Sequence, residues 1–245
     1  MNSPETKSLN HEAELQERTR EKLEKLRELP AIKEAFEFLS KELPVKYPEL
    51  AKKFPEALPY HGEPHSEDVM HEAVMFALED GSLTEREIEL LAVAASYHDA
   101  GFAEVYDSNE EEGAKLAKAA MGRLGYSEEE ADRVFKIIMG TRVKLMPNFE
   151  QLVDEKTDKN DKLAQLLADA DVSNFGREDY FEKSEKVFQE LVGMGKAQDT
   201  PEARAGFKKF GVNMLKTHKW NTAAASRLRD EQKSKNLAEL EKSIS

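Results

Sequence analysis

The stretch that decides the fold is Leu91-Ala-Val-Ala-Ala-Ser-Tyr-His-Asp-Ala100, where an apolar run ends in His98 and Asp99. Thr84 and Glu87 ahead of it are spaced as a capping box, and the apolar residues that follow recur at helical intervals, which predicts a buried helix. Burying an imidazole and a carboxylate without partners costs several kcal/mol. Each of these two groups must therefore meet a metal ion or a hydrogen-bonding group.

Composition limits the kinds of partner and site. A chain of 245 residues can bury one sizeable core, which favours one domain with a terminal extension. The net charge of -13 disfavours nucleic-acid polymers and anionic membranes, while a local basic pocket for a small anion stays open. Because cysteine is absent, any metal must be held by histidine and carboxylate groups. The polar N-terminus and the lack of a long apolar run predict a cytoplasmic protein with no membrane partner.

Residues 1–58 are expected to form a helical extension that packs on the core or projects from it. The first 29 residues are highly charged and carry only a thin apolar stripe, as in a surface helix, so pairing with another subunit in a homo-oligomer stays open. After Pro30 the apolar residues recur at helical spacing, and this helix is expected to end before Pro44. Four more prolines up to Pro64 predict a turn-rich approach to the next helix.

Capping residues predict three further helix starts, at Ser66, at Asn109 with Glu112, and at Ser127 with Glu130. On the first of these helices His65 shares a face with apolar residues. Gly125 and Gly140 are expected to close the other two. Residues 141–160 lack periodicity and are interpreted as a long loop, which at this length is either functional or mobile. A lid is the function that we expect for it.

The apolar stripe resumes over residues 161–171 and ends in two carboxylates, Asp169 and Asp171, so it repeats the ending of the run at His98. Further helices are expected over residues 178–192, 201–217 and 222–241. The chain shows no tandem repeat, glycine-rich phosphate loop or alternating strand pattern. The predicted fold class is therefore all-α.

The predicted helices bring four residues of metal-ligand type to core-facing ends: His65, His98, Asp99 and Asp171. Helical bundles build metal sites by converging side chains from facing helices. Two imidazoles and two carboxylates make a mixed nitrogen and oxygen set that suits Mn, Fe, Co, Mg or Zn. Each residue alone is more often an ordinary core or surface residue, so the four are informative only as a set.

Four stretches form an ordered pattern: Tyr60-His61 with His65 and Val69, Tyr97-His98-Asp99, Asn109-Glu110, and Leu167-Ala-Asp-Ala-Asp171 with Ser173 and Gly176. This pattern resembles the HD superfamily of metal-dependent phosphohydrolases. In order, the stretches are similar to its opening Tyr-His-Asn-x-x-His motif, the His-Asp pair that gives the superfamily its name, an Asn-Glu element and its closing Asp-Ala-Asp-Leu-Ser-x-x-Gly motif. A C-terminal pattern of the same branch is similar to Asn236-Leu237, which follow Arg227 and Arg229.

The resemblance implies a compact multi-helix bundle over residues 59–245 that acts as an HD-type phosphohydrolase. The implied metal ligands are His65, His98, Asp99 and Asp171. One divalent ion is expected, because two-metal members use further imidazoles and no histidine occurs between His98 and His218. Asp169 is grouped with the catalytic residues and is expected to bond a ligand imidazole or a backbone amide. Gly62 stands where the opening motif commonly has Asn, so the substrate contact of that Asn is not carried over.

The implied reaction is hydrolysis of a small phosphate ester, a nucleotide or a related phosphomonoester or phosphodiester, by a metal-activated water. The leaving oxygen then needs a proton, and the candidate donors near the motifs are Glu110, His61 and Glu104. Glu110 is also explained by its place in the first turn of a helix, where the macrodipole favours a carboxylate. The candidates for phosphate binding, at helix ends that should face the site, are Arg142, Lys144 and Arg177.

Two other functions stay open. The first is a metal-binding regulatory or ligand-binding module of the same fold that performs no turnover. The second is an oxygenase, because iron-containing relatives of this fold include oxygenases, but the missing histidines for a second iron count against it. Hydrolysis is favoured because all four ligand-type residues are present, which a purely structural domain would not require.

Overall fold

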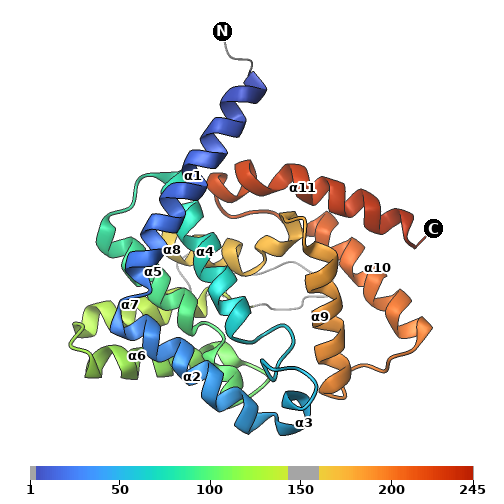
Figure 1. Ribbon diagram of the computed structural model, residues 1–245, viewed down its shortest axis with the longest axis horizontal. Helices are drawn as coiled ribbons and strands as arrows, with labels where there is room; N and C mark the ends of the chain where they lie inside the picture. The colour runs from blue at the N-terminus through green and yellow to red at the C-terminus, as the bar shows by residue number, and fades with distance from the viewer. Residues whose placement is uncertain (1–3, 143–159, 245) are drawn as a thin grey trace.

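The computed structural model describes residues 4–142 and 160–244, which form eleven α-helices and two short 3-10 helices with no strand among them (Figure 1). The prediction of an all-α fold is confirmed. The elements in chain order are α1 (Pro4–Leu26), α2 (Pro30–Lys46), α3 (Pro48–Ala51), α4 (Glu63–Asp80), α5 (Glu85–Tyr97), η1 (Ala100–Ala103), α6 (Asn109–Arg123), α7 (Glu128–Met139), α8 (Lys162–Asp171), η2 (Ser173–Gly176), α9 (Tyr180–Gly193), α10 (Pro201–Thr217) and α11 (Ala223–Lys242).

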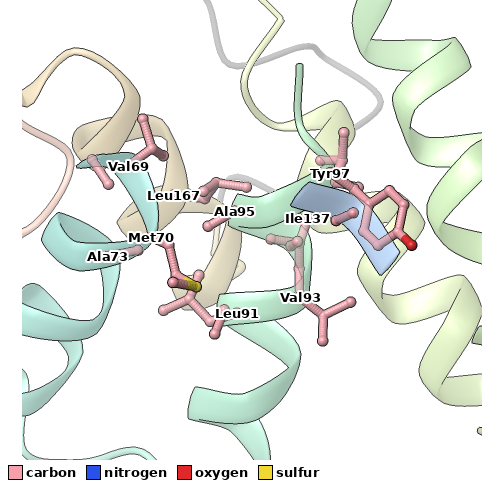
Figure 2. Close-up of a cluster of buried hydrophobic side chains, with 14 of the residues drawn as sticks. Val69, Met70, Ala73, Leu91, Val93, Ala95, Tyr97, Ile137 and Leu167 are labelled. Atoms are coloured by element: carbon pink, nitrogen blue, oxygen red, sulfur yellow. The ribbon is translucent and has the colours of Figure 1, made fainter. Parts of the chain in front are cut away.

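Helix α5 lies at the centre of the core. It packs against α2, α4, α6, α7 and α8, and every residue from Leu91 to Ala100 is buried. Figure 2 shows side chains of α5 beside Met70 of α4, Leu167 of α8 and Ile137 of α7, which all belong to one hydrophobic cluster. From Leu91 onward α5 is almost entirely apolar, and such a surface is stable only when other helices enclose it on all sides. The residues that end this run are therefore held by the core.

Several predicted helix boundaries agree with the structure. The capping boxes of Thr84 with Glu87 and of Ser127 with Glu130 are both formed, which starts α5 and α7 where the sequence places them. Helix α10 has the predicted bounds, and α11 differs from its predicted range by one residue at each end. Local capping chemistry thus decides these boundaries.

Three local predictions are wrong. Helix α2 continues through Pro44 to its end at Lys46. A proline so close to the end removes only one backbone hydrogen bond, and the helical conformation keeps Leu43 buried. Ser66 does not cap α4, which begins three residues earlier with a proline in its first turn, and its side chain is buried inside the helix. Asn109 does not cap α6, because its side chain turns inward.

The N-terminal helix α1 packs on α4 through a narrow apolar stripe. Leu15, Leu23 and Leu26 are buried and belong to the same hydrophobic cluster as the central helices. An ion pair of 2.7 Å between Arg27 and Glu67 adds a surface contact. The N-terminal end of α1 extends beyond the other helices in Figure 1. A division of the chain at residue 58 stays a prediction. Within the described part of the chain, no helix is long and apolar enough to cross a membrane.

Helix α11 fixes the segment that follows η2. Arg229 donates two hydrogen bonds to Glu72 of α4, of 2.8 and 2.7 Å, and both side chains are buried. Gly176 lies so close to α11 that an added Cβ would stand 2.4 Å from the carbonyl oxygen of Arg229. The Asn236 side chain donates to the carbonyl oxygen of Arg177 at 2.8 Å. These contacts hold the backbone of Arg177 beside α4.

His218 and Trp220 lie in the turn between α10 and α11, as the sequence predicts. His218 is buried, and its Nδ1 lies 3.0 Å from Nζ of Lys233, which also donates to the His218 carbonyl oxygen at 2.6 Å. Burial, and next the positive charge of Lys233, lower the pKa of His218 from 6.5 to about 3. The folded protein therefore holds this imidazole neutral.

This lowered pKa makes stability depend on pH. Between the two pKa values the unfolded chain binds the extra proton, so the stabilisation is complete above about pH 6.5 and is lost as the pH falls toward 3. From pH 7 to pH 5 we expect His218 to remove up to about 2 kcal/mol from the free energy of unfolding. Urea unfolding of the wild type and of His218→Gln at both pH values measures the contribution of His218 to the change in the free energy of unfolding. Equal pH dependence in the two proteins would contradict it.

Candidate metal centre

Four side chains from three segments meet at one end of the core. The ligand atoms of His65, His98 and Asp171 all lie within 4.8 Å of one another. Oδ1 of Asp171 is 3.2 Å from Nε2 of His65 and 3.5 Å from Nε2 of His98. Oδ2 of Asp99 lies 3.5 Å and 3.2 Å from the same two nitrogens. The structure thus brings together the four residues that the sequence proposes as ligands.

Two atoms of this cluster show that it fits a cation. Nε2 of His98 and Oδ2 of Asp99 are buried and have no hydrogen-bond partner among the described residues. The other ring nitrogen of His98 lies 2.7 Å from the carbonyl oxygen of Ala95, and Asn109 donates to Oδ1 of Asp99 at 3.1 Å. A ring that donates from Nδ1 turns the lone pair of Nε2 toward the cluster. Buried polar atoms are normally satisfied, and a divalent ion would satisfy both.

The carboxylates of the cluster are charged. Burial alone would raise the pKa of Asp171, but hydrogen bonds and charge from His65 and His98 hold that pKa well below its usual range. The pKa of Asp99 is likewise lowered by His98 against the effect of burial. Two anionic oxygens and two imidazoles are the donors that first-row metals and Mg bind in proteins. The chemistry of this set does not select one of these metals.

Two glycines bring α6 against the backbone of the cluster. A Cβ on Gly101 would stand 1.8 Å from the carbonyl oxygen of Asn109, and a Cβ on Gly113 would stand 2.6 Å from that of Tyr97 and 2.9 Å from that of His98. No other residue type fits at such a distance. This close crossing lets Asn109, in the first turn of α6, reach Asp99.

The alanine variant of Gly113 is expected to lower the free energy of unfolding by about 1–3 kcal/mol, because the new methyl group forces α6 away from His98. The matched control is Gly122→Ala on the same helix, where nothing lies within 4 Å of the new Cβ. This control should gain about 0.5–1 kcal/mol from helix propensity. Urea unfolding measures both variants, and a stable Gly113→Ala protein would contradict the close crossing.

A buried glutamate of α9 organises the neighbouring His61. Glu190 is 1% exposed, and its Oε2 accepts hydrogen bonds from the backbone N–H groups of Tyr60 and His61, both at 3.0 Å. Its Oε1 lies 2.6 Å from Nδ1 of His61 and accepts from the hydroxyl of Tyr106 at 2.9 Å. The His61 ring stacks on Phe102 with 4.6 Å between centroids. Nδ1 is thus engaged, which leaves Nε2 for other partners.

His61 is held in its charged form close to the cluster. Burial alone would lower its pKa, but the Glu190 carboxylate raises it to about 9. Its ring centroid lies 5.7 Å from that of His65. Sequence reasoning names His61 but misses Glu190, because the only local signal is a glutamate on the apolar face of α9. The two residues are 129 positions apart, so no local pattern joins them.

The other proposed catalytic residues lie in different surroundings. The pKa of Glu110 is raised, first by burial and then by the charges of Asp99 and Asp171, so it lies within their field. Glu104 is exposed. Asp169 has the expected backbone amide contacts, but none of its described hydrogen bonds reaches a ligand imidazole. Its four partners are N and Nδ2 of Asn221 and N and Oγ1 of Thr222, at 2.7–2.9 Å.

Two of the three proposed phosphate-binding residues, Arg142 and Arg177, lie in the described part of the chain. For Arg177 the structure shows a position beside the cluster. It lines a small pocket together with His65 and Asp171. Arg142 lies 3.6 Å from Glu111 at the start of α6. Lys144 and the predicted lid over residues 141–160 fall almost wholly outside the described residues, where only 141, 142 and 160 are placed.

The protein is all-α, and its histidine and aspartate cluster has the composition and spacing that could hold a divalent metal. Residues 63–174 match the family model of the HD domain, and this span contains all four residues of the cluster. This part of the chain is therefore an HD domain, the domain that gives its name to a superfamily of metal-dependent phosphohydrolases. No curated protein and no solved structure matches the chain.

Proposed function

We propose that the protein hydrolyses small phosphate esters with the help of one divalent metal ion. The observation that carries this proposal is the pair of buried, unpartnered atoms, Nε2 of His98 and Oδ2 of Asp99, which face each other across 3.2 Å in the four-residue cluster. Membership of the HD superfamily supports the same chemistry. A bound ion would supply a water acidified from a pKa of about 15.7 toward about 7, which can attack phosphorus.

The chain's own residues supply the ligand set and its orientation. His65, His98, Asp99 and Asp171 would hold the ion, which is Mn, Co, Fe, Mg or Zn. The Ala95 carbonyl oxygen fixes the ring of His98, and Asn109 fixes the carboxylate of Asp99. Such outer contacts set ligand direction and tautomer, and losing one typically costs about 10- to 100-fold in metal affinity.

His61 is our proposed proton donor for the leaving oxygen. Glu190 holds its Nδ1 and keeps the ring charged, so Nε2 can give its proton to an alkoxide as the ester bond breaks. Glu110 is the second candidate, because its raised pKa also favours the protonated form. For the phosphate group, Arg177 is our candidate cation, since it lines the same pocket as His65 and Asp171.

The deciding experiment combines metal analysis with a substrate panel. Protein loaded with Mn, Co, Fe or Zn is expected to retain one metal ion per chain after dialysis. It should then release phosphate or alcohol from a nucleotide, an aryl phosphate or a related ester. Absence of bound metal under all four conditions, together with absence of turnover in excess Mg, would refute the proposal. Bound metal without turnover across a broad panel would favour the alternative of a regulatory or ligand-binding module.

A further inference from the structure

The pocket beside the metal cluster holds two cations as well as two metal-ligand residues. Its walls include Tyr60, His65, Asp68, Asp171, Arg177 and Lys183. These residues come from the segment ahead of α4, the start of α4, the end of α8, the segment after η2 and the first turn of α9. The pocket has a volume of about 10 Å³, so an anion bound by the cluster would reach the guanidinium and the ammonium group only by displacing a side chain of this wall.

The two cations share one carboxylate. The Lys183 ammonium donates to Oδ2 of Asp68, and Nη2 of Arg177 lies 3.7 Å from the same oxygen. Arg177 is also held by two hydrogen bonds to Asp179, of 3.0 and 2.6 Å. Among the described residues, Asp68 is the one acidic partner of Lys183. Removing Asp68 from this position would thus leave a mostly buried ammonium in need of an anion.

Burial differs across this group. The Lys183 side chain is 15% exposed and that of Arg177 is 22% exposed, whereas that of Asp68 is 34% exposed. The cations are therefore fixed in the wall, and the carboxylate is the member nearest to solvent. A partly buried cation is stabilised most by a partner that has both negative charge and several oxygens that accept hydrogen bonds.

We propose that Lys183 and Arg177 form a second anion-binding position for the substrate, and that Asp68 is an internal counter-ion which a dianionic phosphate displaces. This inference rests on the proposed hydrolysis and narrows its substrate class to phosphomonoesters. Above about pH 7 a monoester phosphate carries nearly two charges and three terminal oxygens, because its second pKa is about 6. One oxygen can face the cluster while the others replace Asp68. A diester has one charge and two such oxygens, so it competes poorly with a carboxylate.

The test compares methyl phosphate, a dianion at pH 8, with dimethyl phosphate, a monoanion. Isothermal titration of the full-length protein, metal-free and metal-loaded, measures the dissociation constants. We expect methyl phosphate to bind about ten-fold or more tightly than dimethyl phosphate. Lys183→Gln should weaken methyl phosphate binding by about 10- to 100-fold, the value of one charge-assisted hydrogen bond. Asp68→Asn should tighten it, because the internal competitor is gone.

Two neighbouring residues provide matched controls. Lys186→Gln removes an exposed ammonium one turn further along α9, which pairs at 3.0 Å with Glu182. Glu67→Gln removes the carboxylate next to Asp68, which pairs with Arg27 on the surface. Both controls should bind methyl phosphate like the wild type. Circular dichroism of all four variants reports whether each one folds.

The decisive result is that Asp68→Asn and Lys183→Gln change the affinity for methyl phosphate in opposite directions. If Asp68→Asn and Lys183→Gln both weakened binding, or neither changed it, the ion pair would only tie α4 to α9 and the inference would be wrong. Turnover assays separate it from the proposed function. The expected binding pattern without any ester hydrolysis would overturn the hydrolase proposal alone. Hydrolysis of monoesters and diesters at equal efficiency, unchanged in Lys183→Gln, would overturn the second anion position alone.

Discussion

Replacing Asp171 by alanine is expected to abolish tight metal binding and leave the fold intact. Replacing Asp169 by alanine should instead lower the stability of the fold and leave the metal ligands in place. The two carboxylates are two residues apart at the end of α8. Asp171 faces the imidazoles of His65 and His98. Without one of four ligands, we expect metal affinity to fall by more than about 100-fold. Elemental analysis after dialysis and metal titration measure this loss.

Asp169 is expected to be a stability residue. It is fully buried, and its two oxygens accept hydrogen bonds from the backbone N–H groups and the side chains of Asn221 and Thr222. These two residues directly precede α11. In Asp169→Ala two backbone donors lose a charged acceptor, so the free energy of unfolding should fall by about 3 kcal/mol or more. Urea unfolding in the presence of a chelator measures this change without metal. The Asp171→Ala protein should lose less.

The paired variants test which of the two carboxylates is the ligand. A stable Asp169→Ala protein that no longer holds metal, together with an Asp171→Ala protein that does, would reverse the assignment. Loss of both metal and stability in each variant would mean that α8 carries one coupled unit. The contacts predict neither result, because the hydrogen bonds of Asp169 and the short distances of Asp171 involve different partners.

The sequence predicts well which side chains meet in the cluster, because their positions depend on local periodicity. His65 and His98 stand on the core-facing side of apolar helical stripes, and Asp171 closes a third stripe. Once the three helices pack through those stripes, these residues must converge. The all-α class follows from the same periodicity. The capping boxes at Thr84 and Ser127 are equally local, and they form as expected.

The sequence predicts contacts poorly where one residue type serves two purposes. Asn109 has the chemistry of a helix cap and stands where a helix begins, yet its amide binds Asp99 because Gly101 and Gly113 bring the two backbones together. Asp68 and Lys183 belong to charged patterns that normally mark a solvated face. Only the packing of α9 near α4 makes them neighbours, since 115 residues separate them.

Removing the carboxylate of Glu190 is expected to slow turnover without removing the metal. If His61 gives a proton to the leaving oxygen, His61→Asn should lower kcat by about 100- to 10,000-fold. Glu190→Gln should lower kcat by a large part of that factor, because the ring then loses both its fixed direction and its charge. Metal content should match the wild type in both variants. The matched control is Glu185→Gln on the same helix, where the carboxylate pairs with Arg204 at the surface.

The double variant decides how Glu190 acts. Residues that work as one unit give losses that do not add, so His61→Asn with Glu190→Gln should be about as slow as His61→Asn alone. Glu190 also accepts the backbone N–H groups of Tyr60 and His61, which shape the approach to α4. If the two losses multiplied, and if Glu190→Gln also lost metal, its role would lie in that backbone and so in the position of His65. A proton donor other than His61, with Glu110 next in line, would then have to serve the leaving group.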